Sequence, residues 1–109
     1  MQNEQSAELL ASVRILDAPV RDMLAEDLPR QLAAIHTALG VADLATARLE
    51  VHAVRGSAAF CKLARLRDAA AALENSLINN EKNAEHIRAF ENNIKSVLHA
   101  LEHAKENTG

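Results

Sequence analysis

The sequence predicts an all-α protein: an antiparallel up-down four-helix bundle with a short extra helix at its N-terminus. Alanine, leucine, glutamate and arginine dominate the composition, which favours helices, and β-branched residues are too sparse to build a sheet. Apolar residues recur three and four positions apart in four long segments separated by short breaks, as in the helices of a bundle. At 109 residues the chain can bury one modest core, so we expect one domain, 1–109, whose ordered part spans about 6–105.

The first expected helix is short. Ser6 and Glu8 can start it, and its apolar residues follow at helical spacing: Leu9, Leu10, Val13 and Leu16. The sequence Asp17-Ala18-Pro19 ends this helix, and Pro19 suits the first turn of the next one.

A second helix is expected from about Val20 to Leu39. Pro29 lies inside it and either kinks it or starts a new helix that Asp27 caps, and the sequence does not decide between the two. Gly40 follows directly and is a suitable C-terminal cap.

The third expected helix begins after Asp43, which can cap it, and ends near Phe60-Cys61-Lys62. Its core stripe is spaced three and four residues apart: Leu44, Ala47, Val51, Val54 and Ala58. His52 is turned by about 100° from Val51 around the helix axis, so it borders the core and points outward.

Two more helices are expected after residue 62. The fourth carries many alanines, which permit close packing, and ends at Asn79-Asn80; the fifth begins between Glu81 and Asn83 and runs to about Lys105. The apolar stripe of the fourth is Leu63, Leu66, Ala70, Leu73 and Leu77, and that of the fifth is Ile87, Phe90, Ile94, Val97 or Leu98, Leu101 and Ala104.

The segment from Val51 to Ser57 contains the candidate functional residue, His52. Side chains on a helix lean toward its N-terminus, so the residue at position 56 would cover the imidazole, and a glycine there covers nothing. A glycine inside a helix costs about 1 kcal/mol relative to alanine, so we interpret Gly56 as room for a bulky group to reach His52. Arg55 and Arg48 flank the same spot and suit an anion. The pattern therefore predicts a site for a phosphoryl group.

The residues His52-Ala53-Val54-Arg55-Gly56-Ser57 resemble the phosphorylation motif of histidine-containing phosphotransfer (HPt) domains, His-x-x-Lys/Arg-Gly-Ser. Lys62 departs from the family pattern, because a glycine is common in the turn after the motif. The resemblance extends over roughly residues 8 to 100 and includes three flanking segments: Glu26-Asp27-Leu28-Pro29 before a leucine-rich helix, Asp43-Leu44 before the motif helix, and Leu63–Glu74 after it.

The resemblance implies that His52 accepts and donates a phosphoryl group, through its Nε2 atom, in a multistep phosphorelay. Arg55 would steady this group, Gly56 would give it access, and Ser57 would be the polar residue that follows. The implied partners are the receiver domains of a hybrid histidine kinase and of a response regulator. Mg²⁺ would be bound by the receiver, and no cofactor is expected on this chain.

We expect a phosphotransfer intermediate rather than an enzyme, without ATP-dependent autokinase activity by itself. An autokinase dimerisation domain carries an acidic residue directly after its histidine, where this chain has Ala53, and no phosphate-cradling loop for ATP is present. The sequence leaves open whether this is a free-standing protein or the C-terminal domain of a larger hybrid kinase.

Charge and exposure predict where a receiver would dock. Residues 48–67 include five basic residues and one acidic residue, a net charge of +4, whereas the whole chain has a net charge of −3. An acidic receiver pocket would be attracted to such a face. We expect a monomer whose docking face includes Ala45, Leu49, Gly56 and Ala59 together with part of the second helix.

The alternative function is a non-catalytic bundle that docks a receiver or another effector through the same surface. His99-Ala100-Leu101-Glu102-His103 matches the H-x-x-E-H pattern of zinc peptidases, but a third protein ligand is lacking, so no metal site is expected. Cys61 is the only cysteine, and we interpret it as a small buried side chain.

The composition also excludes classes of partner. The net negative charge and the lack of aromatic residues among the basic ones argue against nucleic acid. No stretch approaches the roughly 18 apolar residues of a membrane span, and the N-terminus lacks a signal pattern, so we expect a cytoplasmic protein without direct membrane contact.

Overall fold

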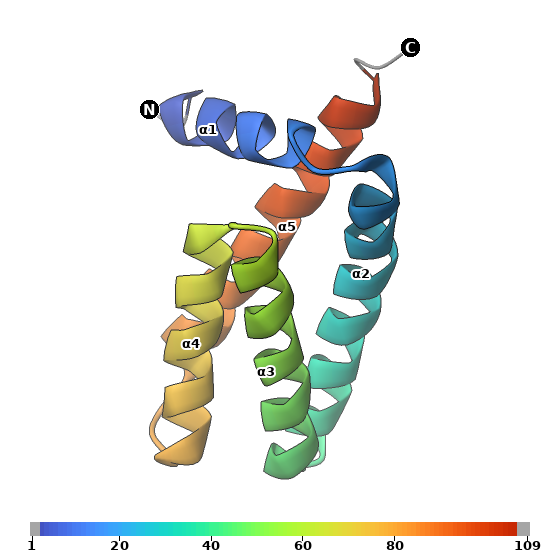
Figure 1. Cartoon of the computed structure of the whole chain (residues 1–109). Coiled ribbons are helices and arrows are strands. Elements are labelled where there is room, and N and C mark those ends of the chain that lie inside the picture. The colour runs from blue at the N-terminus through green and yellow to red at the C-terminus, as the bar shows by residue number, and fades with distance from the viewer. Residues whose placement is uncertain (1–2, 107–109) are drawn as a thin grey trace.

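The structure is a computed structural model that describes residues 3–106, and this part of the chain contains five helices and no strand (Figure 1). The prediction of an all-α fold is therefore confirmed. The helices are α1 (Asn3–Arg14), α2 (Ala18–Gly40), α3 (Leu44–Phe60), α4 (Ala64–Ile78) and α5 (Ala84–Glu106).

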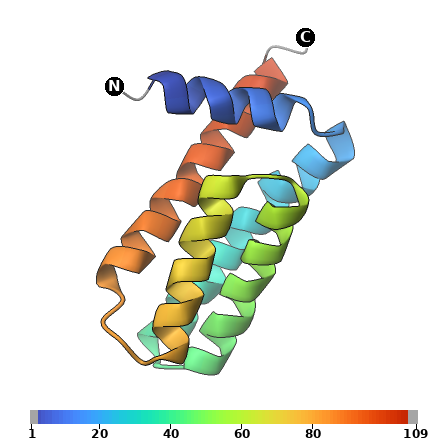
Figure 2. The same cartoon turned by 60° about the vertical axis from the view of Figure 1, so that its left-hand side comes forward.

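The helices α2 to α5 pack side by side as a bundle. Each contacts the next along the chain, and α5 also contacts α2. In Figure 1 the chain descends along α2, rises along α3, descends along α4 and rises along α5. Helix α1 crosses the C-terminal part of α5 and packs against it, as Figures 1 and 2 both show.

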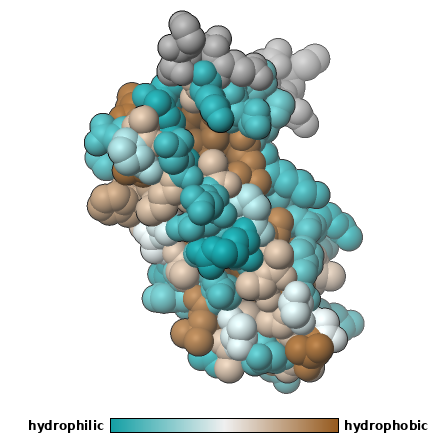
Figure 3. Space-filling view, turned by 90° about the vertical axis from the view of Figure 1, so that its right-hand side faces the viewer, coloured by the Kyte–Doolittle hydropathy of each residue, from teal (hydrophilic) through white to brown (hydrophobic). Residues whose placement is uncertain are grey.

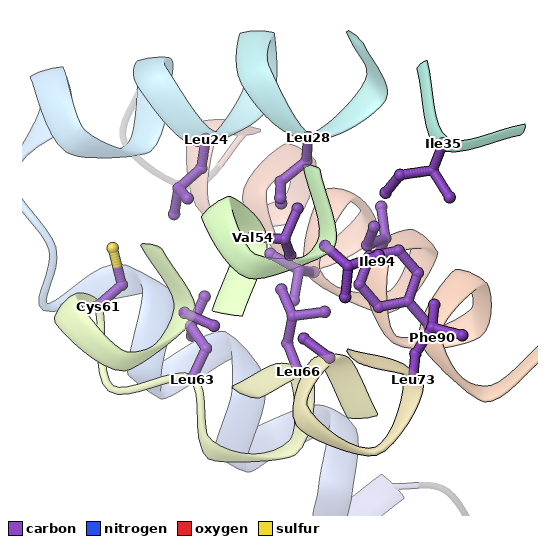
Figure 4. Close-up of a cluster of buried hydrophobic side chains, with 14 of the residues drawn as sticks. Leu24, Leu28, Ile35, Val54, Cys61, Leu63, Leu66, Leu73, Phe90 and Ile94 are labelled. Carbon is purple, nitrogen blue, oxygen red and sulfur yellow. The ribbon is translucent and has the colours of Figure 1, made fainter. Parts of the chain in front are cut away.

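The core lies mainly between α2, α3, α4 and α5, and α1 adds Val13 to it. Leu24, Leu28 and Ile35 of α2 point toward Val54 of α3 and Ile94 of α5 (Figure 4), and all five are buried. Removing such side chains from water is the main favourable contribution to folding. The other buried apolar residues are Val13, Ala38, Ala47, Val51, Ala58, Cys61, Leu63, Leu66, Ala70, Leu73, Leu77, Phe90, Val97, Ala100, Leu101 and Ala104.

The connections that follow α2, α3 and α4 are built in the same way. Each contains one residue with a positive φ: Ala42 at 58°, Lys62 at 59° and Asn80 at 55°. At the end of α2, the N–H of Asp43 donates to the carbonyl of Ala38 at 2.8 Å, and the N–H of Ala42 donates to that of Leu39 at 3.2 Å. Equivalent bonds close α3 and α4. This pair of bonds is the Schellman motif, which satisfies the last carbonyls of a helix.

Of the two caps expected at the ends of helices α2 and α3, the structure has one, Asp43. Gly40 was expected as the C-terminal cap of the second helix, which is wrong: it is the last helical residue, and the left-handed position is Ala42. Lys62 has the left-handed conformation that a glycine adopts without steric cost, which explains why glycine suits this turn. Asp43 caps α3 as expected, because its carboxylate accepts hydrogen bonds from the N–H and the hydroxyl of Thr46 at 3.2 and 2.6 Å.

The start of α1 differs from expectation, and the structure decides between a continuous helix and a new one at Pro29. Helix α1 begins at Asn3 rather than at Ser6, so Ser6 is an internal residue and not the start. Helix α2 continues through Pro29 without a break, and Asp27 pairs with Arg30 at 3.1 Å instead of capping a new helix. Pro29 lies on the exposed face of α2, where water can bond the carbonyl that loses its amide donor.

None of the helices between residues 3 and 106 combines the length and the apolar character that crossing a lipid bilayer requires.

Candidate functional site

His52 lies in the middle of α3, and 68% of its side chain is exposed. Its neighbours Val51 and Val54 are fully buried against the rest of the bundle. The core stripe of α3 therefore fixes the rotation of the helix and turns His52 outward.

A carboxylate from the next helix binds the inner nitrogen of this histidine. The Nδ1 atom of His52 lies 2.8 Å from Oε2 of Glu74 on α4. Leu63, in the turn between α3 and α4, is equally far from both residues in sequence. In a hairpin of two antiparallel helices such equidistant positions lie side by side, so the short turn at residues 61–63 brings Glu74 to His52.

Glu74 also binds the second motif residue. The Nη1 atom of Arg55 donates to Oε1 of Glu74 at 2.9 Å, so the two carboxylate oxygens hold an imidazole and a guanidinium side by side. Only 13% of the Glu74 side chain is exposed. Burial alone would raise the pKa of Glu74, but the hydrogen bonds and positive charges of Arg55 and His52 outweigh burial and lower the pKa below its ordinary value of 4.5.

This contact decides which nitrogen of His52 can act as a nucleophile. An ionised carboxylate only accepts hydrogen bonds, so Nδ1 must carry the hydrogen. In a neutral imidazole, Nε2 is then the nitrogen with a free lone pair. The arrangement leaves a nucleophilic nitrogen at the outer edge of an exposed ring.

The surface next to His52 is open. Apart from the residues adjoining Gly56 and the nearby backbone of α3, no atom lies within 4 Å of the place where a Cβ atom of Gly56 would stand. Ser57, the next motif residue, is half-buried. Arg48 is exposed and makes no hydrogen bond or ion pair within the part of the chain that the structure describes. Arg48 therefore remains available to an incoming anion, whereas Arg55 is already bound to Glu74.

The residues expected to form the docking face lie on the outer side of α3. Ala45, Leu49 and Ala59 are all exposed, and Leu49 keeps 71% of its surface accessible. Phe60 lies four residues after Gly56 and eleven after Leu49, so it shares this face of the helix, and it is 77% exposed. Figure 3 shows the side of the molecule on which α2 lies, where hydrophobic patches alternate with hydrophilic ones.

The two histidines of the H-x-x-E-H segment meet near the end of α5. The Nε2 atoms of His99 and His103 are 3.0 Å apart. Within the described residues, no group of three or more potential metal ligands surrounds them or any other point.

A family model for the Hpt domain matches residues 19–106. The chain belongs to the Hpt domain family. The resemblance predicted from the motif is thereby confirmed. Among curated proteins no match was found, and among solved structures no match was found.

Hpt domains have a histidine phosphotransfer role in phosphorelay signalling by two-component systems, and they interact with receiver domains. They are carriers without a kinase activity of their own. The matched region begins in the first turn of α2, so α1 lies outside it.

Sequence reasoning on this Hpt domain missed two residues of the site. Glu74 was noticed only as the end of a segment that resembles the family, and no role was assigned to it. Glu74 and His52 are equally far in sequence from Leu63 in the turn, and this spacing could have identified Glu74. Phe60 marks the end of the expected third helix, and its spacing from Leu49 also places it on the face where docking is expected.

Proposed function

We propose that this Hpt domain is a phosphocarrier in which Nε2 of His52 accepts a phosphoryl group from a receiver aspartate and returns it to another receiver. The observation that supports this most strongly is the 2.8 Å contact between Nδ1 of His52 and Glu74. It assigns the proton to the inner nitrogen and leaves Nε2 with its lone pair on the exposed side. No separate general base is then required.

The other motif residues have supporting roles. Phosphoryl transfer depends mainly on positioning and on stabilising the charge of the equatorial oxygens. Arg48 would supply this charge directly, while Arg55 holds Glu74 in place and would reach the oxygens once a phosphoryl group is present. Gly56 leaves the space through which a receiver approaches, and Ser57 provides a polar neighbour.

The partners are proposed to be the receiver domains of a hybrid histidine kinase and of a response regulator. Mg²⁺ and the acidic residues that bind it would come from the receiver. The docking face would consist of Ala45, Leu49 and Ala59, extended by Phe60. We further propose a monomeric, cytoplasmic, antiparallel up-down four-helix bundle as the working form.

The experiment is transfer of label from a phosphorylated receiver to the wild-type protein, to His52→Ala and to His86→Ala. His86 is an exposed histidine of α5 and makes the matched control. We expect acid-labile, base-stable label on the wild type and on His86→Ala, and none on His52→Ala. Label that persists on His52→Ala would refute the assignment.

A docking module without phosphotransfer is the second candidate, and the exposed side chains of Leu49 and Phe60 favour it. It predicts receiver binding that His52→Ala leaves unchanged and no label on the wild type with any receiver. That combination would replace the phosphocarrier proposal.

A further inference from the structure

Glu74 is a fixed anion directly behind the candidate phosphoryl acceptor. Both of its oxygens have partners, at 2.8 Å on His52 and at 2.9 Å on Arg55, and its side chain is largely buried. Its pKa lies below the ordinary value, so it is ionised at neutral pH. A neutral acceptor could also orient the imidazole, so the negative charge of Glu74 is not needed for orientation alone.

We propose that the negative charge of Glu74 keeps the proton on Nδ1 after His52 has been phosphorylated, and that it thereby speeds departure of the phosphoryl group. This inference rests on the proposed function. It concerns the outward half of the reaction, in which His52 is the leaving group.

The chemistry of the two half-reactions shows why this proton matters. On the way in, the Nε2 lone pair forms a bond to phosphorus while the bond from phosphorus to the receiver aspartate breaks and its electron pair leaves on the carboxylate. Nδ1 keeps its hydrogen, so the phosphorylated ring carries a positive charge. On the way out, a carboxylate oxygen attacks phosphorus, the N–P bond breaks, and its electron pair returns to Nε2 to give a neutral imidazole. If Nδ1 had lost its proton beforehand, the leaving group would be an imidazolate, which is far more basic.

The local charges make Glu74 the group that controls this proton. The positive charges that act on Glu74 are His52 and Arg55, both on α3. Helix α2 packs on α3 as well, but its described side chains form their ion pairs elsewhere, as in Arg30 with Asp27 and His36 with Glu91. The proton on Nδ1 is therefore held by one carboxylate whose charge Arg55 partly offsets.

Two matched substitutions separate the charge from the hydrogen bond. Glu74→Gln removes the charge and keeps one oxygen that can accept from Nδ1, while its amide nitrogen replaces the oxygen that accepts from Arg55, so it should weaken retention of the proton. Arg55→Gln removes the offsetting cation and leaves the carboxylate, so it should strengthen retention. The two variants are expected to change the outward reaction in opposite directions, which a general disturbance of the site would not do.

The experiment loads each protein with label from a phosphorylated receiver, removes the receiver, and measures release of label to fresh receiver and to water from about pH 6 to about pH 9. In the wild type, release should be fast at the acid end and fall as Nδ1 loses its proton. For Glu74→Gln the fall should begin at lower pH, with release about tenfold slower than wild type at the alkaline end, because a charge-assisted hydrogen bond is about twice as strong as a neutral one. For Arg55→Gln the fall should begin at higher pH, whatever its absolute rate, and Glu74→Gln should converge with the wild type at the acid end.

The outcomes distinguish this inference from the proposed function. If the wild-type protein takes no label, the proposed function is refuted. A wild type that takes label, together with a Glu74→Gln profile that coincides with it, leaves the carrier role intact and refutes the role of the charge. A Glu74→Gln protein that is slower by the same factor at every pH also refutes it, because that result indicates misplacement of the imidazole rather than loss of the proton.

Discussion

Replacing Gly56 with alanine should make the protein more stable. A glycine inside a helix costs about 0.5 to 1 kcal/mol relative to alanine, because its backbone loses more freedom on folding. The structure gives no opposing cost, since nothing lies within 4 Å of the added Cβ atom. We therefore expect the free energy of unfolding to rise by about 0.5 to 1 kcal/mol, which raises the Tm of a chain of this size by about 2 to 5 °C.

A larger side chain at position 56 should slow phosphoryl transfer without destabilising the fold. Gly56→Leu gains the same stabilisation from its less flexible backbone, but its side chain leans toward the N-terminus of α3 and over the imidazole of His52. We expect it to unfold no more easily than wild type and to accept label from a receiver at least about tenfold more slowly, roughly the effect of displacing reacting groups from their working geometry.

Thermal unfolding and receiver-to-protein transfer, measured on the same preparations, check both expectations. Gly40→Ala is the control: its Cβ also meets nothing, and it lies at the end of α2, away from His52. It should leave transfer unchanged and stabilise the protein less than Gly56→Ala does, because Gly40 is the last residue of its helix and not an internal one. A destabilised Gly56→Ala, or a Gly56→Leu that transfers at the wild-type rate, would show that Gly56 is not present for access.

Three further predictions concern the scaffold. Lys62→Gly should raise the free energy of unfolding by about 0.5 to 1 kcal/mol in urea titrations, because Lys62 has a φ of 59° that costs a non-glycine residue about 1 to 2 kcal/mol, and Lys62→Ala should show no such gain. Phe90→Ala should lower it by about 3 to 5 kcal/mol, since Phe90 is 1% exposed; a loss below about 1 kcal/mol would contradict its place in the core. The pKa values of Asp43 and Glu74 lie below their ordinary 3.8 and 4.5, so the stability that both contribute should be complete above about pH 4.5 and be lost as pH falls through the lower native values. Unfolding titrations from pH 6 to pH 3 should then show a steeper loss for wild type than for Glu74→Gln, and equal slopes would contradict this reasoning.

The sequence was sufficient to predict the five helices and the outward direction of His52. The spacing of apolar residues predicted the buried stripe of α3 correctly. Burying that stripe allows only one rotation of α3 about its own axis, so the outward direction of His52 was predicted with it. The turns were harder to predict. Ala42 and Lys62 adopt a conformation that their residue types disfavour, so composition alone directed attention to Gly40, two residues too early.

The spacing of residues within one helix could not predict the side-chain contacts between helices. Arg55 was expected to face the phosphoryl group, and its ion pair with Glu74 depends on how α4 is rotated against α3. Pro29 illustrates the same limit in another way. Whether a helix breaks at a proline depends on whether the surrounding packing compensates for the lost bond, and here Leu28 is fully buried beside an exposed Pro29, so α2 is held in one piece.

The proposed chemistry is confined to a single hairpin, whereas the core that supports it is drawn from all five helices. His52, Arg55 and Glu74 belong to α3 and α4, and Phe90 and Ile94 of α5 contribute only to packing. Inherited changes in this protein should therefore fall into two kinds. Substitutions in the distant core change the fraction of molecules that are folded, while each folded molecule keeps the wild-type phosphotransfer rate. Substitutions in the hairpin change the phosphotransfer rate of each molecule and leave the folded fraction at its wild-type value.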